Sequence, residues 1–253
     1  MKYQHLSESV SLKKVSEEDN LGVFHIEGLY TGYGVTLGNA LRRTLLSSLP
    51  GAAITSVKIK GVGHEFSTIP GILEDVVEIC LNLKKVRFQF PGESGFTEPE
   101  VLTLHAKKEG EVTAADINDS GRVTVVNKDQ HIATITDKKT ELNIEFEIEK
   151  GIGYVPVEQR QKDKLAIGVI AIDAIFSPVN LVNFNIENIR VGQRIDFNKV
   201  TMEVETDGSI EPEVAMKNAA EILVDHFRTV SELDVSNLEK LVKKTSGKKK
   251  SRK

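Results

Sequence analysis

The chain has 253 residues, 40% of them hydrophobic and 28% charged, a balance that excludes a largely disordered protein. No apolar run reaches the roughly 18 residues of a membrane-spanning helix, and the N-terminus lacks the apolar core of a signal peptide. The single cysteine, Cys80, excludes an internal disulfide. We therefore expect a cytoplasmic, globular protein.

The net charge of −4 conceals an uneven distribution. Residues 243–253 contain seven Lys or Arg and no acid, so residues 1–242 hold 26 basic and 37 acidic groups, a net charge of −11. A basic end on an acidic body is typical of a disordered tail that contacts polyanions without sequence preference. We expect such a tail over 236–253, with weak nonspecific DNA contact through Lys243–Lys253.

The first elements are a strand over 23–27 and, after a glycine-containing stretch, a helix over 37–49. One side of this helix is apolar, and the other side carries Asn, Arg and Leu in place of the Lys and Glu of a solvated face. Arginine is enriched at protein interfaces, where Lys and Glu are depleted, so this pattern favours a binding helix. The apolar stripe comprises Leu37, Leu41, Leu45 and Leu49, and the other side comprises Asn39, Arg43 and Leu46, with Arg42 at its margin.

Three glycines, Gly32, Gly34 and Gly38, precede or begin this helix. Their spacing differs from the phosphate-binding G-x-G-x-x-G pattern, and no Walker lysine follows. A tight backbone turn before the helix is the favoured interpretation. An enzyme that holds a nucleotide on this loop stays open as an alternative.

The rest of the chain mixes strands and helices without regular alternation. Period-two alternation predicts strands over 57–60, 101–106, 142–148, 182–189 and 200–205. A second helix is predicted after Pro70-Gly71, and a third begins at Pro212, a residue suited to a first helical turn, and runs to Val230. These elements predict an α+β fold, without a regular βαβ arrangement.

Catalytic and metal-binding patterns are weak throughout. The six histidines form no pair at metal-ligand spacing, and the adjacent His64-Glu65 is better explained as a polar pair at a strand end. No nucleophile elbow, kinase signature or paired-carboxylate motif appears. We expect no catalytic residue, cofactor or metal in this chain.

Several segments in register nevertheless resemble one family. Thr36-Leu-Gly-Asn-Ala-Leu-Arg-Arg-Thr-Leu-Leu-Ser-Ser48 resembles the signature helix of bacterial-type DNA-directed RNA polymerase alpha subunits. The segments HEFST at 64–68, GILED at 71–75, LNLK at 81–84, VTAADI at 112–117, GYVP at 153–156 and FSPV at 176–179 follow in the family order. The resemblance covers nearly all of residues 10–232.

The resemblance implies a two-part fold and a homodimer. A dimerisation subdomain, formed by a sheet and two helices, would combine residues 1–50 with 177–235, and an inserted β-rich subdomain would occupy 51–176. Two copies would pair through the first and third helices. The implied dimerisation residues are Leu37, Leu41, Leu45, Ala215, Ala219, Ile222, Leu223 and Phe227.

The resemblance further implies a non-catalytic role in a nucleotidyltransferase complex that transcribes DNA into RNA. The dimer would bind the beta and beta-prime subunits and so nucleate polymerase assembly. Implied beta contacts are Asn39, Arg42, Arg43, Leu46, Ser47, His64, Glu65, Phe66 and Ser67. Implied beta-prime contacts, carried by fewer matching positions, are Lys84 and Arg190.

The sequence departs from the family in its length. Most bacterial alpha subunits continue through a linker into a small helical DNA-binding domain, and no such domain follows here. A freestanding dimeric adaptor outside the polymerase therefore remains an alternative, beside the nucleotide-binding enzyme. Recovery of two very large partners would separate the polymerase subunit from both alternatives.

Overall fold

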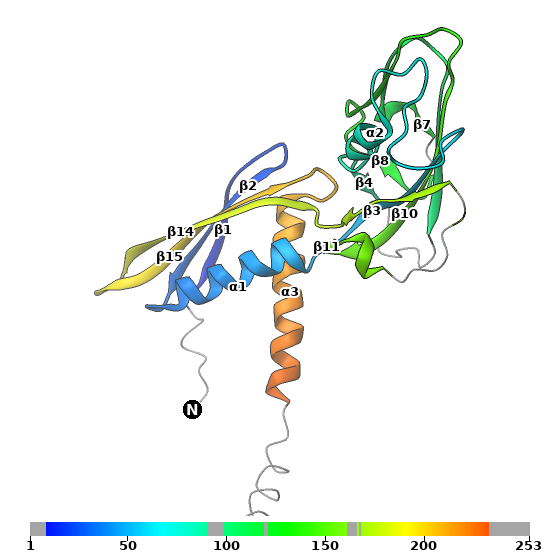
Figure 1. The fold of residues 1–253 in the computed structure, drawn as a ribbon. Helices are drawn as coiled ribbons and strands as arrows, with labels where there is room; N and C mark the ends of the chain where they lie inside the picture. Colours follow the sequence, from blue (N-terminus) through cyan, green and yellow to red (C-terminus); the bar gives the residue numbers. More distant parts are fainter. Residues whose placement is uncertain (1–8, 91–98, 119–120, 161–165, 167, 233–253) are drawn as a thin grey trace, which may run out of the picture.

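The protein folds into two lobes joined by a narrow connection (Figure 1). The computed structural model describes residues 9–90, 99–118, 121–160, 166 and 168–232. The first lobe holds a four-stranded antiparallel sheet and two helices, and the second holds a five-stranded antiparallel sheet, a short helix and small β-ribbons. The predicted α+β class is confirmed, whereas the predicted basic tail lies outside the described residues.

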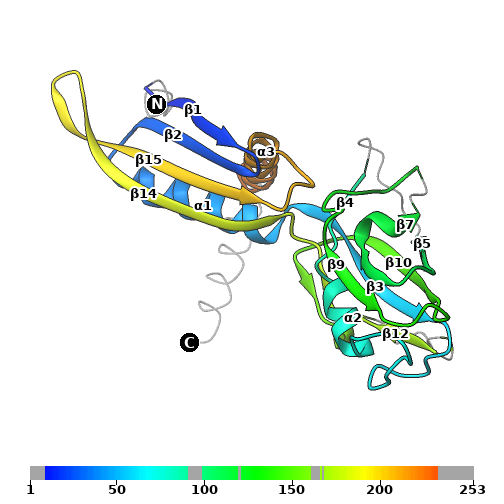
Figure 2. The ribbon, with the colours of Figure 1, turned by 90° about the horizontal axis from the view of Figure 1, so that it is seen from above.

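The sheet of the first lobe has the strand order β1-β2-β15-β14. Alternation builds it: in β2, Phe24 and Ile26 are buried under the helices while the residues between them are half-buried on the other face. β14 and β15 form a long hairpin whose tip extends away from the second lobe (Figure 2). The strands are β1 (Ser11–Glu18), β2 (Leu21–Leu29), β14 (Val179–Val191) and β15 (Arg194–Thr206).

Helix α1 (Tyr33–Ser47) lies along one face of this sheet, beneath β14 and β15 (Figure 2). Its inner stripe is confirmed, since Leu41, Leu45 and Leu49 are buried, although Leu37 is only half-buried. The predicted boundaries 37–49 were wrong by a few residues. The helix begins one turn earlier because glycines inside it are compatible with helical geometry, and Leu49 packs just beyond its C-cap.

The glycines have different roles from the single turn that we expected. Gly32 alone makes the turn: it has φ of 87° at the N-cap, and its N–H donates to Asn198 Oδ1 at 2.8 Å. Gly34 and Gly38 lie inside α1 and face the sheet. A β-carbon at Gly38 would lie 2.8 Å from the ring of Phe184. These two glycines therefore allow the helix backbone to approach the strands closely.

Helix α3 (Pro212–Ser231) crosses α1 and then continues past the edge of the lobe (Figure 1). The predicted start at Pro212 is confirmed. Its first half is anchored in the core through Ala215, Met216 and Ala219, whereas nearly every residue from Val224 onward is exposed. No helix among the described residues is long and apolar enough to cross a membrane.

The second lobe is built on a sheet of strand order β12-β3-β10-β5-β7. The alternation predicted over 142–148 is confirmed: Leu142, Ile144, Phe146 and Ile148 of β10 are each at most 1% exposed. The large strands are β3 (Pro50–Ile59), β5 (Glu100–Ala106) and β10 (Leu142–Ile152). The short ones are β4 (Phe88–Gln89), β6 (Gly110–Thr113), β7 (Ile117–Asn118), β8 (Thr124–Val125), β9 (His131–Ile135), β11 (Tyr154–Val155), β12 (Val169–Ala171) and β13 (Ala174–Ile175).

The predicted second helix is shorter than expected. Helix α2 spans Val76–Leu83, because Asp75 caps it by accepting the N–H of Glu78 and the preceding Ile72 bridges to Ile135 as extended chain. Single 3-10 turns, η2 (Ala114–Asp116) and η3 (Val157–Gln159), complete the lobe. Both ends of the segment before α2 are thus fixed on neighbouring strands.

A histidine between two carboxylates joins this segment to β9 and β6. His131 contacts Glu74 through Nε2 and Glu111 through Nδ1, both at 2.9 Å. Burial by itself would lower the pKa of His131, but the hydrogen bonds to the two carboxylates outweigh it and raise the pKa above its usual value. The protonated imidazole therefore clamps three segments of the second lobe.

We predict that Gly38→Ala destabilises the protein. Overpacking against Phe184 costs about 1–3 kcal/mol, while the better helix propensity of Ala returns about 1 kcal/mol. The free energy of unfolding from denaturant titration should fall by a net amount on the order of 1 kcal/mol. The control is Gly63→Ala, because a β-carbon at Gly63 meets no heavy atom within 4 Å. Equal stability of Gly38→Ala and wild type would contradict close packing at this position.

We predict that stability of the second lobe falls as pH rises past neutrality. Because the folded pKa of His131 is raised, its contribution is fully present below the unfolded pKa of about 6.5 and is lost as pH rises through the folded value. Denaturant midpoints at pH 6 and pH 8 should therefore differ more for wild type than for His131→Gln. The prediction fails if both proteins lose the same stability over this interval.

Candidate functional site: the outer face of helix α1 and its neighbours

The outer face of α1 presents a polar and cationic surface to solvent. Asn39, Arg42 and Arg43 are exposed, as the sequence predicted. The Asn39 side chain donates to the carbonyl of Val35 at 3.0 Å and is thus held along the helix. Within the described part of the chain, neither arginine forms an ion pair or a hydrogen bond through its side chain. Two free guanidinium groups on an acidic protein body are therefore available to another molecule.

Two further residues expected on this face differ from the arginines. Leu46 is half-buried and packs against the core of the first lobe, so its expected place on the outer side is only partly correct. The position lies between the two faces, and the apolar side chain turns toward the core. Ser47 is exposed and donates to the carbonyl of Arg43 at 2.7 Å. The continuous outer surface is thus narrower than the sequence suggested.

A second exposed group lies in the other lobe, on the loop between β3 and α2. His64, Glu65 and Phe66 are exposed, and Phe66 is 80% exposed despite its aromatic side chain. Ser67 closes the turn by donating to the carbonyl of His64 at 2.6 Å. The backbone N–H of Val76 donates to the carbonyl of Ser67 and fixes the base of the loop. An ordered loop that exposes a phenylalanine is typical of a protein-binding surface.

The two residues expected at a beta-prime contact are less available. Lys84 pairs with Asp173 at 3.2 Å and lies 5.6 Å from the ring centre of Tyr154. Hydrogen bonds from the Val157 N–H, Tyr154 and Lys84 outweigh burial and lower the pKa of the Asp173 carboxyl. Arg190 is exposed near the tip of the β14–β15 hairpin and donates to the carbonyl of Gly192. Lys84 is thus part of an internal network, and Arg190 remains on the surface.

The residues expected to mediate dimerisation divide into two groups. Most of them already pack within one chain: Leu41, Leu45, Ala215 and Ala219 are at most 4% exposed, and Leu37, Ile222 and Leu223 are half-buried. The buried group holds α1 against α3. A direct contact with a second chain is open to Phe227, which is 65% exposed.

The second half of α3 carries more exposed apolar surface than the sequence analysis assigned. Val224 and Val230 are exposed beside Phe227, and none of these three packs into the core of the first lobe. Val224 was missed as a site residue, although its spacing of three residues from Phe227 could have revealed it. An amphipathic helix that projects beyond its own lobe with an apolar stripe needs a partner to bury it.

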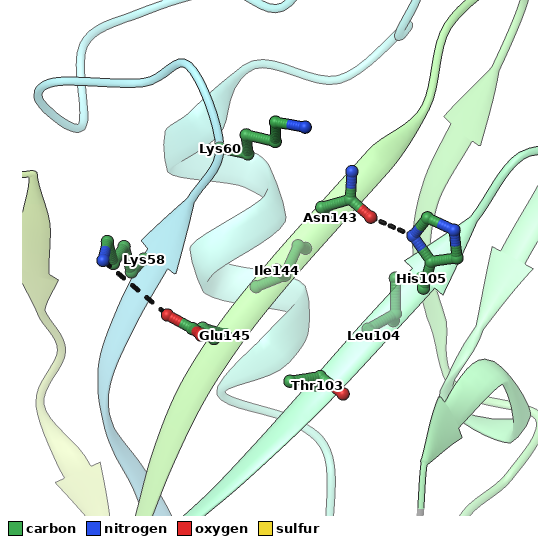
Figure 3. A pocket seen from close by; sticks show the side chains of 8 residues that line it. All are labelled: Lys58, Lys60, Thr103, Leu104, His105, Asn143, Ile144 and Glu145. Atoms are coloured by element: carbon green, nitrogen blue, oxygen red, sulfur yellow. Dashed lines mark hydrogen bonds and ion pairs between the residues drawn. The ribbon is translucent and has the colours of Figure 1, made fainter.

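Two surface depressions were inspected for chemistry. One lies on the outer face of the second-lobe sheet, where Lys58 pairs with Glu145 at 3.8 Å and His105 contacts Asn143 (Figure 3). These side chains are paired with one another and show no nucleophile with a base and an orienting acid. The other is a groove between α3 and the β1–β2 hairpin. Within the described residues no group of three or more His, Cys, Asp or Glu could hold a metal.

The arrangement is suited to binding a macromolecule. Free arginines on a rigid helix and an exposed phenylalanine on an anchored loop provide hydrogen bonding and apolar contact, one in each lobe. A phosphate site on the glycine stretch is disfavoured because Gly34 and Gly38 are covered by the sheet. The site residues thus form surfaces, and no cavity encloses them.

A family model described as "RNA polymerase Rpb3/RpoA insert domain" matches residues 57–177. The chain is 51% identical over 213 residues to the DNA-directed RNA polymerase subunit alpha of Symbiobacterium thermophilum, covering 84% of this chain and 66% of that protein. It is 47% identical over 242 residues to the same-named subunit of Alkaliphilus oremlandii, covering 95% of this chain and 75% of that protein.

The subunit of Limosilactobacillus reuteri is 49% identical over 222 residues, which cover 87% of this chain and 69% of that protein. The chain thus spans between about 66% and 75% of the length of these relatives. The matches include both the sheet-and-helix lobe and the inserted lobe, at an identity far above what shared fold alone produces. The chain belongs to the family of DNA-directed RNA polymerase alpha subunits.

Proposed function

We propose that this chain is a non-catalytic assembly subunit of DNA-dependent RNA polymerase. Two copies pair, and the pair binds the beta and beta-prime subunits of the nucleotidyltransferase that copies DNA into RNA. One observation carries the proposal: Arg42 and Arg43 stand unpaired on the outer face of α1 in a protein with an acidic body. The family membership and the named role of the relatives support it.

Arginine suits this role for a physical reason. Its planar guanidinium can bond a carboxylate or two carbonyls at once and is weakly hydrated, so burying it in an interface costs less than burying an ammonium. α1 is rigid because its inner stripe is buried in the core, and Arg43 therefore reaches its partner with little loss of backbone entropy. We assign Asn39, Arg42, Arg43 and Ser47 of α1, together with the loop 64–67, to the beta subunit.

The two lobes take different tasks in this proposal. Residues 1–50 with 177–235 form the dimerisation subdomain, and residues 51–176 form the insert that extends the binding surface. Lys84 and Arg190 are assigned to the beta-prime side, with Arg190 as the more exposed of the two. The basic residues 243–253 supply nonspecific DNA contact, and the complex works in the cytoplasm.

Self-association follows from the projecting half of α3. Val224, Phe227 and Val230 offer an apolar stripe that the chain itself leaves in water. A second copy would bury this stripe, and a twofold arrangement would apply the same patch twice. The hydrophobic gain from three such side chains is several kcal/mol, at roughly 1.5–3 kcal/mol for each large apolar side chain fully buried.

Neither alternative function gains a specific observation. A nucleotide-binding enzyme would need an accessible glycine loop, and the sheet covers two of its three glycines. A freestanding adaptor would use the same surfaces but would recover no large polymerase subunits. Co-purification from cells that produce all subunits therefore separates the adaptor from the proposed function.

We predict that Arg43→Ala leaves the homodimer intact and weakens capture of the beta subunit. If Arg43 is an interface hot spot, the loss is about 2 kcal/mol, or about 30-fold in affinity. Quantitative co-purification of beta measures it, with sedimentation as the check on the dimer. The matched control is Arg122→Ala, an exposed arginine of the second lobe outside the proposed surface. Normal recovery of beta with Arg43→Ala would contradict the assignment.

We predict that Phe227→Glu converts the dimer to a monomer with a folded core. The charge would have to enter the apolar contact between two α3 helices, whereas the same side chain in the monomer is exposed. Sedimentation velocity gives the oligomeric state, and circular dichroism confirms the fold. Thr229→Glu places the same charge on the opposite side of α3 and should remain dimeric. An unchanged dimer for Phe227→Glu would rule out this helix as the interface.

A further inference from the structure

The two lobes touch each other sparsely. Helices and strands of the first lobe pack extensively with one another, as do those of the second, while no such packing joins an element of one lobe to an element of the other. The chain crosses between the lobes twice, between α1 and β3 and between β13 and β14 (Figure 1). Two peptide connections without broad packing leave the angle between the lobes weakly determined.

One buried ion pair crosses this junction. Arg87 Nε lies 3.4 Å from Asp207 Oδ2, and the side chains are only 18% and 7% exposed. Arg87 precedes β4 in the second lobe, and Asp207 follows β15 in the first. Among ion pairs whose two partners both lie in the described residues, the others each stay within one lobe.

Each partner is fixed to its own lobe. The backbone N–H of Arg87 donates to Asn127 Oδ1 at 2.7 Å, and Asn127 in turn donates to the carbonyl of Lys85. Asp207 Oδ1 accepts the N–H and the hydroxyl of Ser209, and the Asp207 N–H donates to the carbonyl of Pro178. The ion pair therefore connects two rigid supports and transmits orientation between the lobes.

We propose that the Arg87–Asp207 pair sets the angle between the lobes, and thereby positions the two contact surfaces for one large partner. Burial protects the pair from screening by salt and water, so it holds this angle more firmly than a surface pair would. The second part of the proposal rests on the proposed function: Arg43 lies in the first lobe and the loop 64–67 in the second. Both can bind one subunit at once only when the lobes are correctly oriented.

The experiment measures the distance between the lobes directly. Spin labels are placed at Glu203→Cys and Lys138→Cys, one exposed site in each lobe. The native Cys80 stays unlabelled because it is buried and burial raises its pKa to about 11. The labelled chain is mixed with excess unlabelled chain, so that each dimer reports one protomer.

The test variant is Arg87→Met with Asp207→Asn, which removes both charges and leaves no buried ion without a partner. Asn can still accept the hydrogen bonds from Ser209. The control is Lys199→Met, which breaks the Lys199–Glu27 pair of similar burial inside the first lobe. Wild type and control should show one narrow distance distribution, and the test variant a broad one. A narrow, unshifted distribution in the test variant overturns the proposal.

Capture of the beta subunit by the full-length chain tests the second part. If the competent orientation falls to about a tenth of the population, the apparent affinity falls about tenfold. A broad distance distribution together with unchanged capture would show that the lobe angle does not position the surfaces. If wild type itself captures no beta subunit, the proposed function fails, while the distance measurement still decides whether the pair sets the angle.

Discussion

The close approach of α1 to its sheet is the constraint on which the rest of the structure depends. Gly34 and Gly38 let the helix backbone lie against Phe184 and its neighbours, and the inner leucines of the helix then fill the core. This packing fixes both the rotation and the height of α1. The helix cannot turn its arginines inward without exposing its leucines, so the cationic face is directed to solvent by the core.

The same principle governs α3, which uses its two halves differently. The first half contributes small side chains to the core and packs on α1, and the second half carries its apolar stripe beyond the lobe. The first lobe thus offers two surfaces that the single chain leaves unused, one cationic and one apolar. Their separation onto two crossing helices allows self-pairing and capture of a larger subunit at the same time.

Much of this could be predicted from the sequence, because alternation in β10 and the leucine spacing in α1 report burial directly. The role of the glycines could not, since Gly38 meets Phe184, which lies 146 residues further along the chain. The pairing of Lys84 with Asp173 and of Arg87 with Asp207 is equally invisible to local patterns, because each pair joins segments that only the fold brings together. The half-burial of Leu46 shows that a position between two helical faces follows the tertiary packing.

The central claim is that α1 divides its faces between its own core and a large polymerase subunit. The most direct measurement introduces a photo-crosslinking amino acid at Asn39, and separately at Phe66, in the full-length chain within cells that assemble the complex. The account predicts that both positions crosslink to the same large polypeptide, although they lie in different lobes. Crosslinks from Asn39 only to a second copy of this chain would contradict it.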